Sequence, residues 1–365
     1  MPSQRRHLRP DYGDVEYVST GGEVREIKTY SYLNNLLAIE KENFDETPSR
    51  NCKWAGCPDY RPLNCNSFHE LGLNNENLSH RSNLLGEGAY RAAYSLNLHI
   101  GNLTETVVFK EFSEDLSDKY LEYVRMEAYV MSRLASSQYI VDMYAFCHLS
   151  VLVENFPRGD MKEKAAPFLK RKNVTLYDTV DVNPLNKFTL TQKVKYALDM
   201  ARGIEAMHSI DLIHDDLKLA QFLLGNNDHI KLNDFSRTKE RVWDPLLKRF
   251  KVYRNSGRHG DCRSPEEYAE KELTEKIDIF SLGSIMFSLL TGLIPFDEIT
   301  DEEEMMDKFM AGKLPFIDPR YKKRDSIERK FVEVMEDCWK FKPEDRPTAV
   351  EVARRLEELV MEESI

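Results

Sequence analysis

The stretch from residue 208 to residue 236, "HSIDLIHDDLKLAQFLLGNNDHIKLNDFS", constrains the fold of this chain more than any other. It sets carboxylates, a lysine and an amide among apolar runs, where a soluble chain would normally bury Val and Leu. A charge removed from water is costly unless it is paired or binds a metal. The polar residues in question therefore lie on open turns or share one site; they are Asp215, Asp216, Lys218, Gln221 and Asp234.

The overall charge and hydropathy of the chain limit the classes of protein to which it can belong. Its 365 residues include 51 Lys and Arg and 62 Asp and Glu, a net charge of −11, so we expect no nucleic-acid partner and no general attraction to an anionic membrane. No apolar stretch reaches the roughly 18 residues that a membrane span requires. The start, "MPSQRRHLRPDYGD", has no apolar core and does not resemble a signal peptide. We therefore expect a cytoplasmic protein without a membrane span.

Six cysteines are too few for a disulfide scaffold in a chain of this length. Cys52, Cys57 and Cys65 cluster before the main domain, but their spacing fits no zinc signature, and we interpret them as free thiols in a loop. The chain also contains three N-x-S/T triplets, which have meaning only in a secreted protein; they begin at Asn77, Asn102 and Asn173. A lumenal or secretory location stays open as the alternative, if the chain is an N-terminally truncated piece.

The hydrophobic periodicity changes along the chain. Residues 1–81 are polar and partly irregular, apart from an amphipathic helix predicted within residues 28–44. From Leu84 onward, two strand-like runs surround a glycine-rich turn, a helix is predicted over residues 117–135, and two more strands follow. Beyond Phe156 the pattern is mostly helical, and the apolar run "IDIFSLGSIMFSLL" predicts a buried helix. This order predicts an α+β protein in which a small strand-rich part precedes a larger helical part.

Charged residues in both parts have the properties that phosphoryl transfer requires. Lys110 ends an apolar strand, and Glu127 lies on the otherwise apolar stripe of the next helix, where a buried carboxylate needs a cation. Alone, such a lysine is more often solvated and such a glutamate more often lies at the rim. Asp216 and Asp234 add one carboxylate that can orient a hydroxyl and one that can hold Mg²⁺.

Taken together, these stretches resemble a eukaryotic-type protein kinase domain, in the same order throughout residues 82–361. "LLGEGAYRAAY" is similar to the glycine-rich loop, and "VVFK" to the strand that carries the phosphate-binding lysine. "HDDLKLAQF" is similar to the catalytic loop, and "NDFS" to the metal-binding Asp-Phe-Gly. "RSPEE" resembles the Ala-Pro-Glu that ends the activation segment, and "DIFSLG" and "CWKFKPEDRP" resemble segments of later helices.

The resemblance implies a bilobal α+β fold. An N-terminal extension over residues 1–81 would precede a small β-rich lobe (82–153), a hinge (154–156) whose backbone binds adenine, and a large helical lobe (157–361). An apolar spine linking the lobes would consist of Met131, Met143, His214 and Phe235. In the large lobe, two further structural contacts are implied, a brace of the catalytic loop by Asp278 and an ion pair between Arg346 and Glu266.

The resemblance also assigns the residues of an active site. Catalysis would rest on Asp216, Lys218, Lys110 and Glu127. ATP would be bound by Gly86, Glu87, Gly88, Ala93, Val108, Lys110, Val153, Glu154, Phe156 and Leu223. Mg²⁺ would be held by Asp234 and Gln221.

Several positions depart from the family pattern. Arg91 replaces the third glycine of the glycine-rich loop, and we expect its guanidinium to contact a phosphate. Gln221 replaces the Asn that holds a second Mg²⁺, which predicts a weaker second metal site. Ser236 replaces a glycine at a sharp turn, and Val108 replaces an alanine over the adenine.

Asp215 is the departure with a consequence for regulation. In the family, an Arg at this position grips a phosphate on the activation segment, which an acid cannot do. We therefore predict that phosphorylation within residues 234–266 is not the main on-switch. Asp215 is expected to pair with a basic residue of that segment instead.

These observations predict an ATP- and Mg²⁺-dependent kinase with a protein substrate. Lys218 favours Ser/Thr acceptors, although "CWKFKPEDRP" is typical of the tyrosine-kinase-like branch. A pseudokinase that binds nucleotide or acts as a scaffold is the alternative, on the basis of Arg91, Gln221 and Ser236. A kinase of sugars or secreted proteins is a third possibility, which the cysteine cluster and the N-x-S/T triplets fit. Neither the identity of the substrate nor the oligomeric state follows from the sequence.

Overall fold

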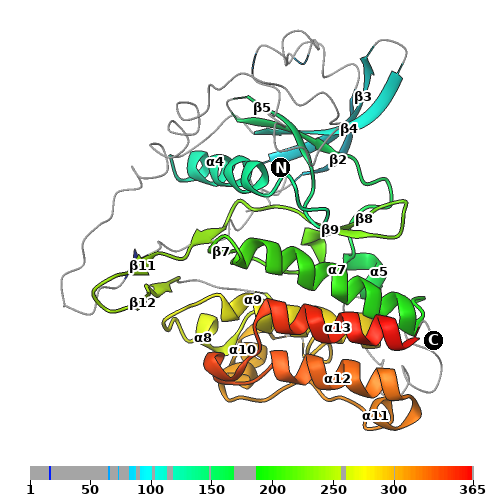
Figure 1. Cartoon of the computed structure of the whole chain (residues 1–365), viewed down its shortest axis with the longest axis vertical. Helices are drawn as coiled ribbons and strands as arrows, with labels where there is room; N and C mark the ends of the chain where they lie inside the picture. Colours follow the sequence, from blue (N-terminus) through cyan, green and yellow to red (C-terminus); the bar gives the residue numbers. More distant parts are fainter. Residues whose placement is uncertain are drawn as a thin grey trace, which may run out of the picture.

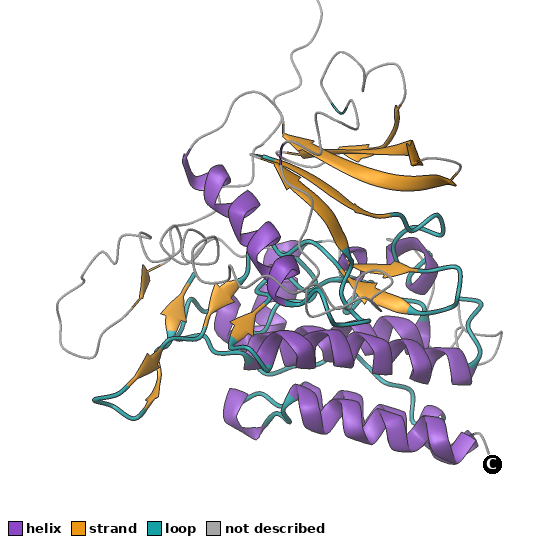
Figure 2. Ribbon diagram, turned by 45° about the horizontal axis from the view of Figure 1, so that its top comes forward, coloured by secondary structure: helices purple, strands orange, loops and turns teal. Residues whose placement is uncertain are grey.

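The computed structural model describes residues 16–17, 65, 73, 82–87, 91–100, 103–112, 118–147, 149–167, 186–255, 260–299 and 301–363. A small sheet with one helix beside it lies above a larger group of helices (Figure 1, Figure 2). The prediction of an α+β fold with a strand-rich part followed by a helical part is therefore confirmed. The helix predicted within residues 28–44 lies outside the described residues, as do Cys52, Cys57 and Gly88.

The sheet of the small part has five antiparallel strands in the spatial order β2-β3-β4-β6-β5. They are β2 (Ser82–Glu87), β3 (Arg91–Ile100), β4 (Leu103–Phe112), β5 (Met143–Cys147) and β6 (Ser150–Glu154). Successive side chains of a strand point to opposite faces, so the sheet contributes to two separate cores. Val107 and Phe109 belong to a small cluster on one face, whereas Val108 and Val153 join the main core on the other.

Helix α4 (Asp118–Arg133) lies on the face of the sheet that belongs to the main core, and it confirms the helix predicted over residues 117–135. Val124, Ala128 and Met131 form its buried stripe. Glu127 lies on the same stripe and has no exposed area. A carboxylate in this position requires cations close to it.

The larger part is built around helix α9 (Lys276–Thr291), which is buried from Ile277 to Thr291, as its apolar sequence predicted. Gly292 ends the helix in the left-handed conformation, with φ of 82°. Gly283 allows a close approach to Trp339, because a Cβ at this glycine would lie 2.9 Å from the indole ring. The other helical elements are α5 (Lys162–Ala165), α7 (Leu190–His208), η1 (Leu219–Gln221), α8 (Pro265–Tyr268), α10 (Glu302–Met310), α11 (Tyr321–Arg324), α12 (Ser326–Cys338), η2 (Pro343–Asp345) and α13 (Ala349–Glu363).

Short pairs of strands carry the segments that lead into and out of the stretch from residue 208 to residue 236. β7 (Leu212–Ile213) pairs with β10 (Lys239–Glu240), and β8 (Phe222–Leu224) pairs with β9 (Ile230–Leu232). These pairs fix the chain on both sides of Asp216 and Asp234. Two further pairs lie nearby, β11 (Trp243–Asp244) with β12 (Arg249–Phe250) and β1 (Glu16–Tyr17) with β13 (Tyr253–Arg254).

The structure corrects the interpretation of Cys65 as a free thiol. Cys65 forms a disulfide with Cys147 at the end of β5, with a distance of 4.7 Å between the two Cα atoms. Cys65 lies near Cys52 and Cys57 in the sequence, but its disulfide partner Cys147 is 82 residues away. The spacing of the cysteines alone could therefore not identify this disulfide. Cys262 and Cys338 are free and buried. Among the described helices, none has the length and apolar character needed to cross a bilayer.

Candidate active site

The predicted lysine and glutamate meet between the sheet and helix α4. Lys110 Nζ donates to Glu127 Oε1 at 2.7 Å, so the ion pair expected from the sequence is present. The same ammonium donates to Asn233 Oδ1 at 2.9 Å and thereby connects β4 with the segment next to Asp234. Burial, assisted by the charge of Arg91, lowers the pKa of Lys110 to about 7, although the charge of Asp234 opposes the shift.

Arg91, which stands in place of the third glycine, points toward helix α4. Its guanidinium forms an ion pair with Glu127 Oε2, so this buried carboxylate is paired with Arg91 on one oxygen and with Lys110 on the other. We expected this guanidinium to face a phosphate. The structure places it against the glutamate, where a cation stabilises the buried carboxylate, and its contact with a phosphate stays a prediction.

The predicted ATP-binding residues form neighbouring rows across the sheet. Ala93 pairs with Gly86 on one side and with Lys110 on the other, while Val108 pairs with Val153 two residues further along the strand. Several of them lie in or against the main core that spans both parts of the fold; they are Ala93, Val108, Val153, Phe156 and Leu223. An apolar wall beside a buried lysine suits a flat aromatic base and its phosphates.

Two predicted ATP-binding residues, Glu87 and Glu154, do not belong to this apolar wall. Glu87 ends β2 and its side chain is exposed. Glu154 ends β6, and its carboxylate accepts a hydrogen bond from Lys231 Nζ at 2.7 Å. Its side chain is therefore engaged by the large part of the fold, and its backbone N–H donates to the main-chain oxygen of Asp142 at 2.9 Å.

The catalytic loop, residues 214–221, is held in place by Asp278 of helix α9. The carboxylate of Asp278 accepts hydrogen bonds from the backbone N–H of His214 at 2.8 Å and of Asp215 at 3.1 Å. It also contacts the ring of His208 at 2.9 Å. The brace expected at Asp278 is thus present, and it sets the loop backbone immediately before Asp216.

Asp216 is surrounded by cations. Its Oδ1 forms an ion pair with Arg263 and lies 3.6 Å from Arg237, and its Oδ2 lies 3.3 Å from Lys218 Nζ. Burial would raise the pKa of Asp216, but the charges of Arg263, Lys218 and Arg237 outweigh it and hold the pKa well below its usual range. The carboxylate is therefore ionised and fixed in direction.

Asp234 lies opposite Asp216, and Gln221 connects the two. The Gln221 side-chain amide donates to Asp234 Oδ2 at 3.2 Å and to Asp216 Oδ2 at 3.4 Å. The Ser236 hydroxyl donates to Asp234 Oδ1 at 2.7 Å. Although burial raises the pKa of Asp234, the charge of Lys110 and the hydrogen bond from Ser236 lower it overall.

The donor set around Asp234 fits Mg²⁺. This ion prefers carboxylate and carbonyl oxygens and commonly completes its coordination with water and substrate phosphates. Asp234 supplies a carboxylate, and rotation of the Gln221 amide would present its oxygen. The described residues contain no group of three or more His, Cys, Asp or Glu arranged to hold a metal by themselves, so phosphate oxygens would have to contribute.

Asp215 connects the catalytic loop to the activation segment, residues 234–266. Its carboxylate accepts hydrogen bonds from the Tyr253 hydroxyl at 3.0 Å and from the Asn255 amide at 2.9 Å. Arg263, a basic residue that the sequence analysis did not single out, donates to the Asp215 main-chain oxygen at 2.9 Å. Since Asp215 and Tyr253 are almost completely buried, this connection is internal to the fold.

Two further predicted contacts join the site to the rest of the fold. The rings of His214 and Phe235 lie 5.7 Å apart, and Met131 and Met143 belong to the same core as Phe235, in keeping with a spine between the lobes. At the end of the activation segment, both oxygens of Glu266 accept hydrogen bonds from the guanidinium of Arg346, at 2.6 Å and 2.8 Å.

Sequence reasoning missed Asn233 and Arg263 as members of the site. Asn233 directly precedes Asp234, and Arg263 directly precedes the Ser-Pro-Glu that ends the activation segment. Their neighbours in sequence were singled out, but nothing in the sequence shows that these two side chains turn toward Lys110 and Asp216. Only the folded arrangement brings them there.

Comparison with known proteins agrees with this geometry. Residues 80–356 match the profile of a family described as protein tyrosine and serine/threonine kinase. Serine/threonine-protein kinase 12 of Arabidopsis thaliana is 30% identical over 218 residues, which are 58% of this chain and 41% of that protein. Fibroblast growth factor receptor 1 of Dugesia japonica is 26% identical over 297 residues, 78% of this chain and 32% of that protein. The chain thus spans between about a third and two fifths of the length of these relatives.

Proposed function

This chain belongs to the protein tyrosine and serine/threonine kinase family, and on that premise we propose that it transfers the γ-phosphate of ATP to a hydroxyl group of a protein, with Ser and Thr as the favoured acceptors. One observation carries the proposal. The buried Lys110 contacts Glu127 and Asn233 at once, so the phosphate-binding lysine is held directly beside the segment that carries Asp234.

Each charged group has a defined task in this proposal. Lys110, held by Glu127, binds the α- and β-phosphates, and Asp216 orients the acceptor hydroxyl through its fixed, ionised carboxylate. Lys218, which is half exposed beside Asp216, neutralises charge on the transferring phosphoryl group. Asp234 and Gln221 would hold Mg²⁺, which supplies charge neutralisation to the phosphates when bound.

The preference for Ser and Thr rests on Lys218. It follows Asp216 by two residues, in the manner of Ser/Thr kinases, and its ammonium reaches the Asp216 carboxylate at 3.3 Å. The 30% identity to Serine/threonine-protein kinase 12 is compatible with this preference. The identity to Fibroblast growth factor receptor 1, 26%, is nearly as high, so the comparison does not decide between the acceptors. Peptide panels with Ser, Thr or Tyr as the sole acceptor test the preference directly.

The activity is tested by transfer of labelled phosphate from ATP with Mg²⁺ to protein and peptide panels. Asp216→Asn removes the orienting carboxylate and is expected to abolish transfer, because Asn cannot provide the same charge to the acceptor hydroxyl. Asp307→Asn makes the same chemical change at an exposed position of α10 and should leave transfer unchanged. Wild-type protein that binds ATP but transfers no phosphate to any panel would support the pseudokinase alternative instead.

A further inference from the structure

The disulfide between Cys65 and Cys147 joins the region that matches the kinase family to the segment that precedes it. Cys147 ends β5 inside the region that matches the family, whereas Cys65 precedes that region, which begins at residue 80. The two Cα atoms lie 4.7 Å apart, within the range that a disulfide spans without backbone movement. The extension is therefore covalently attached to the small lobe.

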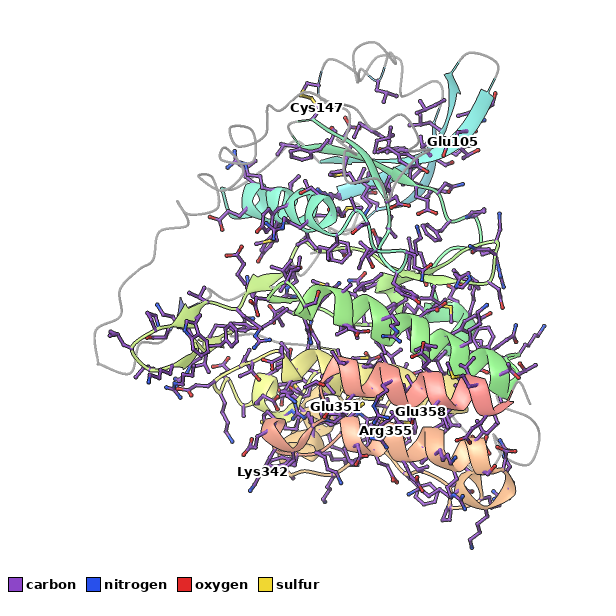
Figure 3. All side chains as sticks on the ribbon, in the orientation of Figure 1. Glu105, Cys147, Lys342, Glu351, Arg355 and Glu358 are labelled. Carbon is purple, nitrogen blue, oxygen red and sulfur yellow. A yellow bond between two sulfur atoms is a disulfide. The ribbon has the colours of Figure 1, made fainter. Side chains whose placement is uncertain are left out.

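The attachment point is also a hydrophobic contact. The face of the sheet turned away from α4 carries its own small core, formed by Leu96, Leu98, Val107, Phe109, Ala145 and Leu152. Leu73 from the extension packs against this core together with Cys147, which ends β5 at the edge of the sheet (Figure 3). The extension thus contributes an apolar side chain, that of Leu73, to the core on this face of the sheet.

The remaining described cysteines are consistent with an oxidising environment. Cys262 and Cys338 are the free cysteines of the described chain, and both are buried. Burial raises the pKa of Cys338 to about 12 and that of Cys262 well above its usual range, so neither forms the reactive thiolate. The described part of the chain therefore exposes no free thiol that could exchange with the Cys65–Cys147 bond.

We propose that this kinase matures and acts in an oxidising compartment, such as the lumen of the secretory route, and that its acceptors are proteins that enter the same compartment. In forming the bond, the two thiols lose two electrons and two protons to a protein disulfide, which is reduced to its dithiol. A cytosolic glutathione pool would keep the two thiols reduced. The statement about acceptors rests on the proposed kinase function; the statement about the compartment does not.

The sequence also contains possible glycosylation sites, which fit a lumenal location. Three N-x-S/T triplets, at Asn77, Asn102 and Asn173, can accept N-linked glycans only in a secreted or lumenal protein. The proposal therefore takes up the lumenal alternative rather than the cytoplasmic location expected first, because the disulfide and these triplets both support it.

The compartment is tested on the full protein in the cells that make it. Free thiols are blocked with N-ethylmaleimide before lysis, and the protein is digested without reductant and analysed by mass spectrometry. We expect a cross-linked peptide pair containing Cys65 and Cys147. Recovery of both cysteines as maleimide adducts would overturn the proposal, and the result is independent of any kinase assay.

A double-mutant cycle separates the bond from the packing of its two side chains. Cys65→Ala, Cys147→Ala and the double variant should each lower the Tm of the oxidised protein by the same amount, ~5–10 °C, because each breaks the same bond. Reductant should lower the Tm of the wild type by a similar amount and leave all three variants unchanged. Additive losses, or an equal effect of reductant on the variants, would show that no bond forms between these positions.

Discussion

Arg263 and Asp216 form a buried ion pair that connects the end of the activation segment to the catalytic loop. The guanidinium of Arg263 also donates to the main-chain oxygen of Asp215 at 2.9 Å and to Glu267 Oε1 at 3.3 Å. One side chain therefore fixes the direction of the orienting carboxylate, the backbone before it and the start of helix α8. We interpret Arg263 as a positioning residue for Asp216.

Arg263→Lys should lower kcat, by about 10- to 100-fold, with little change in the KM for ATP. A lysine keeps the charge, but its single ammonium cannot contact Asp216, the Asp215 main-chain oxygen and Glu267 at once as the guanidinium does. Loss of a charge-assisted hydrogen bond costs ~1.5–3 kcal/mol. Arg355→Lys is a matched control, because Arg355 forms a partly exposed pair with Asp337. Steady-state kinetics would contradict this interpretation if Arg263→Lys raised kcat, since Arg263 would then be blocking Asp216.

The lowered pKa of Lys110 predicts a pH dependence of ATP binding. With a pKa of about 7, the ammonium loses its proton as pH rises through neutrality, so the KM for ATP should increase between about pH 7 and pH 9. Lys110→Arg keeps the positive charge over this range and should remove the increase, even where its kcat is lower. A KM that depends equally on pH in both proteins would assign the effect to another group.

Protonation of Lys110 also affects stability, with a defined sign. Its pKa is lowered on folding, so the unfolded chain binds more protons than the folded one between about pH 7 and its usual pKa near 10.4. The contribution of this residue to the free energy of unfolding therefore increases with pH across that interval. Thermal unfolding of Lys110→Met compared with the wild type measures this contribution.

The contact between Lys110 and Glu127 was predictable from the residues themselves, because Glu127 stands on an otherwise apolar helix stripe and a buried carboxylate needs a cation. The pair of Arg346 with Glu266 was expected only from the resemblance to the kinase family. The strands of the small lobe and the buried helix α9 were also predictable, the strands from their short apolar runs next to turn residues and the helix because it is apolar on nearly every face.

The contacts that were not predictable depend on distances that periodicity does not encode. Arg91 was expected to face a phosphate, and its attraction to Glu127 follows from the burial of that carboxylate. Cys65 pairs with a residue 82 positions away, and Asn233 meets Lys110 across 123 positions. The first two contacts depend on packing within the small lobe and its extension, and only the contact of Asn233 with Lys110 depends on the approach of the sheet to the helical part.

The contacts of Asp215 predict an activation segment that is ordered without a phosphate. Protein treated with phosphatase should keep most of its activity, because Tyr253 and Asn255 replace the arginine-to-phosphate link with hydrogen bonds to a buried carboxylate. Loss of most of the activity after this treatment would contradict the prediction. Phosphopeptide mapping of the treated sample confirms that residues 234–266 carry no phosphate.

A negative charge introduced next to Asp215 should detach the activation segment, residues 234–266, from the catalytic loop. Asn255→Asp sets a second carboxylate 2.9 Å from the first, where like charges repel and one of them must be protonated. We expect faster proteolysis within the activation segment and reduced activity at neutral pH. Asn226→Asp, at an exposed turn, makes the same change without these effects. Equal rates of proteolysis in the two variants would show that the hydrogen bonds of Asp215 do not hold the segment.

The ion pair between Arg346 and Glu266 predicts a large stability effect far from the catalytic groups. Arg346 is almost completely buried and donates two hydrogen bonds to Glu266, so Arg346→Met leaves an uncompensated carboxylate inside the large lobe. Breaking a buried pair in this way costs ~3–5 kcal/mol, whereas Arg354→Met removes an exposed pair with Glu358 that contributes about 0–1 kcal/mol. Urea unfolding of the two variants measures the difference. If Arg346→Met cost no more than Arg354→Met, the end of the activation segment would have to be anchored by other contacts, such as those of Arg263 with Glu267.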